Sequence, residues 1–356
     1  MGDTGEEDRS RQALRRPPET QPPALESFIA ALPKAELHLH LEGTVSPETW
    51  LRLLKRREPG ASLTVSDLRD RMRFRDLPAF FDAWMSLILA LREPEDFRLI
   101  ALECGRQLAR QNVLYAELHT SVAGAAQAGR LNPDEVIPAI AEGLDEARRE
   151  GGPEWRMIVD IIRDLAAAGD AGIGLDIALR HRHNGVVAVG LGGSEQLYDA
   201  GTAGEAFSTA LDAGLHATAH AGEGAGPESI WAALGIGAQR IGHAARAVED
   251  PVLVEHLAAN RIHLEMCPSS NVCTGAVGSM GEHPLARFLR AGMAISLNTD
   301  DPAFFGADLN TEYARVAAAF DLTRLELVRL ARNSFEGAFL PAADRARYLS
   351  ALDADL

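Results

Sequence analysis

The sequence predicts an α/β protein built as a single (β/α)8 (TIM) barrel, with additional helices after its first strand. Short runs rich in β-branched and apolar residues alternate with longer amphipathic stretches from about residue 28 onward, as in repeated strand–helix units. Eight such runs can be identified, and no linker rich in Gly, Ser or Pro divides them. The length of 356 residues is also within the usual range of one such barrel.

The eight predicted strands are separated by spacers of unequal length. The longest spacer, residues 47–112, reads mostly as helix and lies between the first two strands. A long insertion after a barrel strand falls on the face that carries active sites, so its helices around residues 68–91 are candidates to cover a pocket. The predicted strands are residues 35–40, 113–120, 155–162, 186–193, 216–220, 240–243, 262–267 and 294–300.

An apolar set at roughly helical spacing lies within this insertion. Two interpretations stay open: ordinary core packing, which is the commoner origin of such a pattern, or a lid over a substrate. The set consists of Phe74, Leu77, Phe80, Phe81, Trp84, Leu87 and Ile88.

Residues 1–26 are predicted to form a disordered tail, and residues 27–356 the barrel domain. The tail is polar, charged and proline-bearing, so it has too little apolar surface to offset the entropy of ordering. It lacks the apolar segment of a secretory signal, and no apolar stretch follows Arg15 and Arg16 as a twin-arginine signal requires.

Composition excludes several classes of partner. A net charge of −16, from 35 Lys and Arg against 51 Asp and Glu, is unsuited to binding a nucleic-acid backbone. No apolar run reaches the ~18 residues that a membrane span needs. Cys104, Cys267 and Cys273 form no C-x-x-C pair, which indicates reduced thiols in a cytoplasmic protein.

Two histidines point toward metal chemistry at the end of the first predicted strand. His38 and His40 are two residues apart, so both side chains share one face of the strand while Leu37 and Leu39 occupy the other. In a barrel the histidine face is the interior. The pair therefore predicts a metal site at the carboxyl end of this strand.

Further polar groups stand where other predicted strands end. The fifth strand ends at His220, with Glu223 on the following turn, and the sixth ends at His243. The eighth is followed by Asp300 and Asp301. A role as a helix cap would by itself explain an aspartate at either position. Three imidazoles and one carboxylate suit zinc, which lowers the pKa of a bound water to ~7, and the remaining groups are left for proton transfer.

These segments together resemble the adenosine/adenine deaminase family of metal-dependent hydrolases. The resemblance covers nearly the whole chain after the tail, and its motifs are jointly specific although H-x-H alone is not. The matching motifs are LPKAELHLHLEGT at 32–44, HAGE at 220–223, RIGH at 240–243, CPSSNV at 267–272, EHPL at 282–285 and SLNTDDP at 296–302.

The resemblance implies a ligand set and a catalytic set. Glu223 would donate a proton to purine N1, and His243 would orient the zinc-bound water and help to deprotonate it. Asp301 would hydrogen-bond purine N7. One zinc ion per subunit would be bound by His38, His40, His220 and Asp300.

The implied substrate is a small purine nucleoside or base, deaminated at C6 with release of ammonia. Gly193 matches the family glycine whose backbone meets purine N3. The substrate-binding set is predicted to comprise Glu42, Gly193, Asp301 and His40. Adenosine or deoxyadenosine is the first expectation; adenine, 6-aminodeoxyfutalosine and an N6-substituted adenine are alternatives. The oligomeric state is not predicted.

Some positions leave the substrate open. Glu42 stands where many adenosine deaminases have aspartate, and glutamate there is commoner among adenine deaminases and other branches. The segment 241–244 is closer to the adenosine branch, but Ala244 replaces the usual glycine. The loop 118–121 follows neither pattern, and its His119 either points into the pocket or packs in the core.

Two other functions remain as rivals. A non-catalytic relative is disfavoured because Glu223, His243 and Asp301 are all present. A different metal-dependent hydrolase is disfavoured because no strand end carries a lysine placed to bridge two metals. The H-x-E and P-C-x-x-C signature of cytidine-type zinc deaminases is absent from the sequence.

Overall fold

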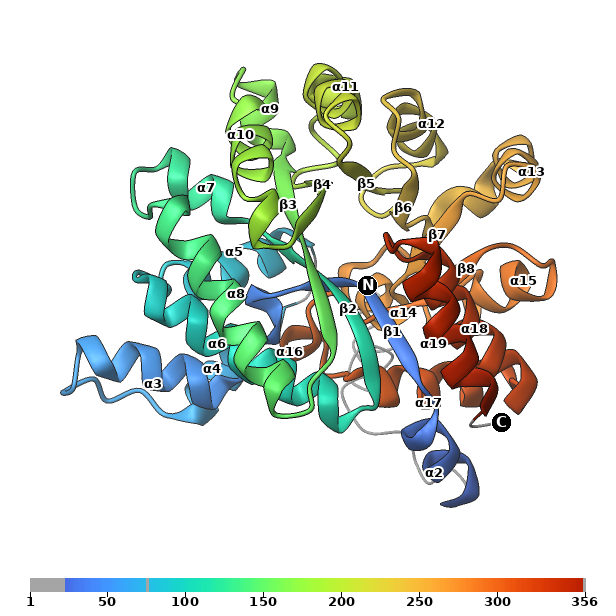
Figure 1. Ribbon diagram of the computed structural model, residues 1–356, viewed down its shortest axis with the longest axis horizontal. Helices are drawn as coiled ribbons and strands as arrows, with labels where there is room; N and C mark the ends of the chain where they lie inside the picture. The colour runs from blue at the N-terminus through green and yellow to red at the C-terminus, as the bar shows by residue number, and fades with distance from the viewer. Residues whose placement is uncertain (1–22, 75–76, 355–356) are drawn as a thin grey trace, which may run out of the picture.

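A computed structural model describes residues 23–74 and 77–354, and at its centre eight parallel strands curl into a barrel (Figure 1). The strands are neighbours in chain order, which is the order of a TIM barrel, so the predicted fold class is confirmed. The strands are β1 (Lys34–His40), β2 (Val113–Thr120), β3 (Glu154–Ile162), β4 (Val186–Gly192), β5 (His216–Ala221), β6 (Arg240–His243), β7 (His263–Met266) and β8 (Ile295–Leu297).

The barrel closes where the chain beyond β8 returns to β1. The N–H of His40 donates to the carbonyl of Asp300 at 2.9 Å, and the N–H of Asp300 donates to the carbonyl of His38 at 3.0 Å. β8 is shorter than the predicted strand 294–300, because Asp300 has a left-handed φ of 63° that a strand does not accommodate. Residues 298–300, which follow the shortened strand, carry polar side chains.

Strand β1 is buried on both faces. Leu37 and Leu39 are buried on one face, and α18 (Arg324–Gly337) packs against both β1 and β8. His38 and His40 occupy the other face, which is the barrel interior. The alternation in the sequence therefore places both histidines inside.

Helices surround the strands, and the additional helices predicted after the first strand are present. α5 (Leu77–Ile88) contacts both η1 (Glu42–Thr44) and α14 (Pro268–Thr274), which follow β1 and β7, so it lies over the carboxyl ends of the strands. The inserted helices are α3 (Pro47–Arg57), α4 (Val65–Arg71), α5 and α6 (Pro94–Arg110). The others are α7 (Val122–Gln127), α8 (Pro133–Arg149), α9 (Arg163–Ala167), α10 (Gly172–Arg180), α11 (Gly204–Asp212), α12 (Pro227–Gly235), α13 (Pro251–Ala259), α15 (Leu285–Arg290), α16 (Pro302–Phe305), α17 (Leu309–Phe320) and α19 (Ala342–Ala354).

The predicted end of the tail at residue 26 falls inside helix α2 (Pro23–Ala31), so the expectation of disorder is wrong for residues 23–26. Leu25 and Phe28 pack against the core and Ile29 is buried, which gives this segment the apolar contacts that the composition of the tail lacks. Lys34 Nζ donates to the carbonyl of Ile29 at 2.7 Å at the end of the helix. Residues 1–22 of the predicted tail lie outside the described residues.

Two further findings concern membrane-spanning helices and the three cysteines. None of the helices described is both long and apolar enough to cross a membrane. Cys104, Cys267 and Cys273 are buried free thiols. The lack of a C-x-x-C pair predicted this second feature correctly.

Candidate active site

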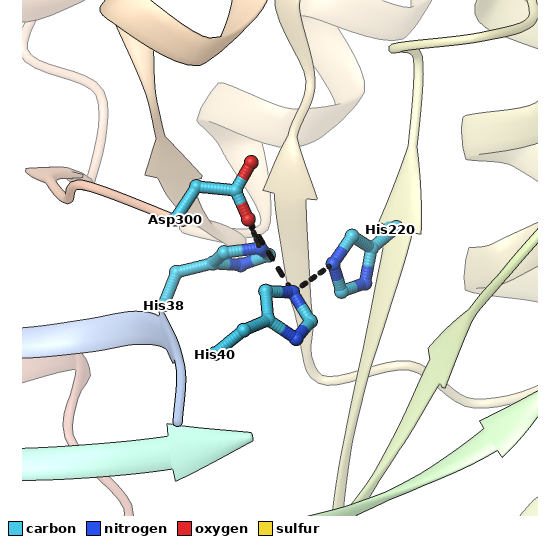
Figure 2. A group of neighbouring side chains, drawn as sticks. All are labelled: His38, His40, His220 and Asp300. Atoms are coloured by element: carbon cyan, nitrogen blue, oxygen red, sulfur yellow. Dashed lines mark hydrogen bonds and ion pairs between the residues drawn. The ribbon is translucent and has the colours of Figure 1, made fainter. Parts of the chain in front are cut away.

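Three histidines and one aspartate meet at the carboxyl ends of the strands (Figure 2). His40 Nε2 lies 3.0 Å from His220 Nε2 and 3.3 Å from Asp300 Oδ1. His38 Nε2 lies 3.5 Å from the same Asp300 oxygen. The structure thus brings together all four residues that the sequence nominated as metal ligands.

The spacing of these four atoms fits a tetrahedral metal ion. Zinc–nitrogen and zinc–oxygen bonds of ~2.0–2.1 Å imply neighbouring ligand atoms roughly 3.3 Å apart. The ring nitrogens of His40 and His220 face each other, and His38 Nε2 is buried without a hydrogen-bond partner among the described residues. A cation between them would satisfy all of these nitrogens at once, so the residues fit the predicted zinc ion.

Hydrogen bonds on the far side of three of the four candidate ligands fix their orientation. His38 Nδ1 lies 2.8 Å from Glu265 Oε2, and His220 Nδ1 lies 3.0 Å from the carbonyl of Leu191. The second oxygen of Asp300 accepts from Ser270 Oγ at 2.7 Å. Outer partners of this kind hold the free atom of each of these ligands toward the metal position.

A buried ion pair keeps the partner of His38 charged. Arg240 Nε lies 2.5 Å from Glu265 Oε1, on the oxygen that does not meet His38. Burial alone would raise the pKa of Glu265, but Arg240 and His38 hold that pKa below its usual range. An ionised Glu265 accepts a hydrogen bond from the Nδ1–H of His38, so that the Nε2 of His38 is free for a metal.

Backbone in the left-handed region aims several of these side chains. His243, Ala244 and Asp300 have φ values of 64°, 51° and 63°. Non-glycine residues rarely adopt this region, and such conformations are concentrated at functional sites. Ala244, which replaces the usual family glycine, is fully buried and does not line the cavity described below.

The three predicted catalytic residues lie beside the metal cluster. His243 Nε2 is 3.4 Å from Glu223 Oε2. Asp301, directly after the ligand Asp300, is buried and its Oδ1 has no hydrogen-bond partner among the described residues. All three line the same cavity as the metal cluster.

Two of these carboxyl groups have raised pKa values. Burial, followed by the charges of Asp300 and Glu195, raises the pKa of Glu223 to about 8. Burial, followed by Asp300 and Glu42, raises the pKa of Asp301 well above its usual range. Burial and the neighbouring carboxylates therefore favour the protonated form of both carboxyl groups.

The site opens into a cavity of about 330 Å³. Its lining includes the candidate ligands His40, His220 and Asp300 and the glycines Gly192 and Gly193. Helix α5 contributes an apolar part of the lining, formed by Phe80, Phe81, Trp84 and Met85.

Helix α5 combines the two roles that the sequence left open. Leu87 is fully buried and Ile88 almost so, and both belong to the core. Phe80 belongs to the core and also lines the cavity, where it stacks on Phe305 with ring centroids 5.4 Å apart. Helix α5 of the insertion therefore packs in the core and also forms part of the cavity lining.

Gly193 occupies the position expected of a residue approached by a ligand. It lines the cavity with a φ of +95°, and a Cβ there would lie 2.7 Å from Asp164 Oδ2. Only glycine fits both constraints without strain. Its contact with a purine stays a prediction.

Glu42 and His119 are not among the residues that line the cavity. Glu42 Oε1 accepts hydrogen bonds from Thr120 Oγ1 at 3.0 Å and from the N–H of Ser121 at 3.2 Å. His119 is fully buried, with its Nδ1 2.7 Å from Asp160 Oδ1, so it has the packing role. The structure therefore does not bring Glu42 directly to the substrate space.

Sequence reasoning missed three cavity carboxylates, Asp160, Asp164 and Glu195. Asp160 lies on β3, where a charged residue within an apolar strand was the available signal. Glu195 follows Gly193 by two residues and accepts hydrogen bonds from the N–H groups of Gly222 at 2.6 Å, Glu223 at 3.1 Å and Gly224 at 2.6 Å. Glu195 therefore holds the turn that carries Glu223.

Comparison with known proteins agrees with this geometry. The adenosine deaminase family model matches residues 33–355. An aminodeoxyfutalosine deaminase of Streptomyces avermitilis is 40% identical over 333 residues, covering 92% of this chain and 92% of that protein. An adenine deaminase of Cupriavidus necator is 38% identical over 336 residues, covering 93% and 94%. A solved amidohydrolase of Burkholderia ambifaria with bound Zn has a TM-score of 0.85 at 25% identity, covering 96% of this chain and 94% of that one.

Proposed function

The chain belongs to the adenosine deaminase family, and on that premise we propose that it hydrolyses the 6-amino group of a 6-aminopurine nucleoside. Its relatives are named as deaminases of adenine-type compounds, which supports the reaction class. Water replaces the amino group, giving a 6-oxopurine and ammonia. One zinc ion per subunit is proposed to be held by His38, His40, His220 and Asp300.

The observation that carries this proposal is the pair of buried carboxyl groups, Glu223 and Asp301, that line one cavity beside the candidate metal ligands. Purine N1 and N7 are both hydrogen-bond acceptors, and they flank the C6 position that loses its amino group. Glu223 and Asp301 have raised pKa values and each has a proton to donate. Two donors around one electrophilic carbon match a 6-aminopurine.

The proposed steps follow from these groups. A zinc ion held by His38, His40, His220 and Asp300 would supply an activated water as the nucleophile. Glu223 donates its proton to N1, which draws electrons from C6 and makes that carbon electrophilic. Asp301 donates a hydrogen bond to N7 and fixes the ring plane, and in this proposal the N–H of Gly193 donates to N3. Of the two protons lost by the water, one restores the acid form of Glu223 and the other converts the leaving amino group to ammonia.

A nucleoside fits the cavity better than a nucleotide. Its volume of about 330 Å³ is at the lower end of the ~300–1,000 Å³ typical of small-molecule sites. The described lining residues include no Arg or Lys, so no cation there would neutralise a phosphate. The acidic lining residues are Asp160, Asp164, Glu195, Glu223, Asp300 and Asp301.

Adenosine or deoxyadenosine is the simplest nucleoside of this class. Aminodeoxyfutalosine is a second candidate, because a relative with that name is 40% identical to the chain. Glu42 does not discriminate between the two nucleosides, since it accepts hydrogen bonds from Thr120 and Ser121 and does not line the cavity.

The net charge of −16 supports a small-molecule substrate in preference to a nucleic acid. Adenine alone would leave the wall formed by Phe81 and Trp84 without a partner, which disfavours the free base. A cytoplasmic location is part of the proposal, and the three free thiols support it.

Ammonia release from a panel of substrates tests the proposal. The zinc-loaded protein is assayed with adenosine, deoxyadenosine, aminodeoxyfutalosine, adenine and AMP. We expect the highest kcat/KM with a nucleoside and the lowest with AMP. A highest value with adenine would overturn the nucleoside assignment, and no turnover of any 6-aminopurine by fully loaded protein would overturn the reaction.

A further inference from the structure

Two buried side chains form a hydrogen-bonded chain behind His243. Asn271 lies on α14, and His283 lies between η5 (Met280–Glu282) and α15. Asn271 is 0% exposed and His283 is 3% exposed, so neither touches the cavity or bulk solvent. We propose that His283 and Asn271 are positioning residues that hold the proton of His243 on Nε2, toward the active site.

The direction of the first hydrogen bond is fixed by a backbone group. The N–H of Leu285 donates to His283 Nδ1 at 3.2 Å. A backbone amide only donates here, so His283 Nδ1 has no proton. Burial also lowers the pKa of His283 to about 3, which keeps the ring neutral. The single ring proton of His283 is therefore on Nε2.

The second and third hydrogen bonds then have only one consistent direction. His283 Nε2 lies 3.1 Å from Asn271 Oδ1 and donates to it. This interaction orients the side-chain amide, so Asn271 Nδ2 faces His243 Nδ1 at 3.0 Å and donates in turn. His243 Nδ1 must accept, and a neutral imidazole that accepts at Nδ1 has its proton on Nε2.

This tautomer places a donor in the active site. His243 Nε2 has no hydrogen-bond partner among the described residues, and it lies within the group formed with Glu223 and Asp300. With a proton on Nε2 and an accepted hydrogen bond on Nδ1, the ring has no free lone pair. His243 therefore orients the nucleophile by donating to it, and the nucleophile's proton passes to Glu223 after Glu223 has given its own proton to purine N1; Glu223 Oε2 lies 3.4 Å from His243 Nε2.

The inference rests on the proposed function only for its catalytic consequence, because the tautomer is measurable without substrate. Long-range ¹H–¹⁵N correlation spectra of histidine-labelled protein distinguish a protonated from an unprotonated ring nitrogen. His243 is assigned by the signals missing from His243→Gln. We expect the wild-type protein to show a protonated Nε2 and an unprotonated Nδ1 on His243; the reverse pattern would overturn the proposal.

The substitution Asn271→Asp tests the positioning role with almost no change of shape. A carboxylate accepts and cannot donate, so the His243 Nδ1 should become protonated. We expect kcat to fall on the order of 10²–10⁴-fold with little change in KM or zinc content. An unchanged tautomer, or a kcat within threefold of wild type, would overturn the proposal. The wild-type spectrum still decides the tautomer if this variant fails to fold.

Asn184→Asp is a matched control. Asn184 Oδ1 lies 3.1 Å from His181 Nδ1, so it makes an analogous contact with a histidine, and neither residue lines the cavity. This control should change only the His181 signals and leave kcat unchanged. If the wild-type protein shows the expected His243 tautomer but deaminates no 6-aminopurine, the function fails and the positioning role stands.

Discussion

The carboxylate of Glu195 accepts a hydrogen bond from the backbone N–H of Glu223 at 3.1 Å, and the adjoining N–H groups of Gly222 and Gly224 donate to the same side chain. β4 and β5 are neighbours in the barrel, so a residue after one strand holds the catalytic turn of the next. The charge of Glu195 also contributes to the raised pKa of Glu223.

Glu195→Gln should lower kcat on the order of 10- to 100-fold, because one acceptor is lost and the proton donor shifts from its working position. Zinc content should stay at the wild-type level. Hydrogen exchange at the amides of Gly222, Glu223 and Gly224 should become faster. Ser229→Ala is the comparison variant: it removes a hydroxyl donor to Glu195 and an acceptor of the Gly222 N–H at 2.9 Å, so it should speed exchange at Gly222 without doing so at Glu223 and Gly224. Unchanged exchange rates at the three amides would show that Glu195 does not hold this turn.

The activity should depend on pH through Glu223. Its pKa is raised to about 8, so the acid form that protonates N1 is present below that pH and is lost as pH rises through it. We expect kcat to decline above pH 8. Glu223→Gln should keep its zinc, lose on the order of 10²–10⁴-fold in kcat and show no such decline. Near-wild-type kcat in that variant would contradict the assigned role.

Asp300→Ala should lower the zinc content of the purified protein, measured by elemental analysis. The substitution removes the oxygen that lies 3.3 Å from His40 Nε2 and 3.5 Å from His38 Nε2. Asp212→Ala, at an exposed position at the end of α11, is the control and should keep full occupancy. Full occupancy in Asp300→Ala would remove this residue from the ligand set.

Trp84→Ala should raise KM for nucleosides more than KM for adenine. Trp84 belongs to the apolar cavity wall on α5, which we expect to contact the group attached to the purine. Asp82→Ala, at an exposed position on the same helix, should change neither value. Equal KM changes for nucleoside and base would show that this wall does not recognise the attached group.

The local pattern of the sequence pointed to the candidate ligands, and the family resemblance selected His38, His40, His220 and Asp300 among them. His38 and His40 share a face through the two-residue period of a strand, and His220, His243 and Asp300 each stand at or just beyond a strand end. The carboxyl ends of barrel strands meet on one face, so local positions become a three-dimensional cluster. The barrel order itself follows from the alternation of strands and helices.

What the sequence did not predict depends on contacts between distant segments. The hydrogen bonds of Asn271 with His243 and His283 join helix α14, the end of β6 and the segment before α15, and no spacing rule brings them together. Glu42 seemed placed for substrate by its distance from His40, yet the 3₁₀ turn after β1 directs it to Thr120. Residues 23–26 were assigned to the tail because composition does not report the packing of Leu25.

The central claim is hydrolysis at C6 of a 6-aminopurine, and oxygen-18 incorporation tests it most directly. The zinc-loaded protein is incubated with adenosine and with aminodeoxyfutalosine in H₂¹⁸O, and the products are analysed by mass spectrometry alongside ammonia release. We predict a 6-oxopurine product with one oxygen-18 atom for each ammonia released. Ammonia release without that label, or no ammonia from either nucleoside, would contradict the account.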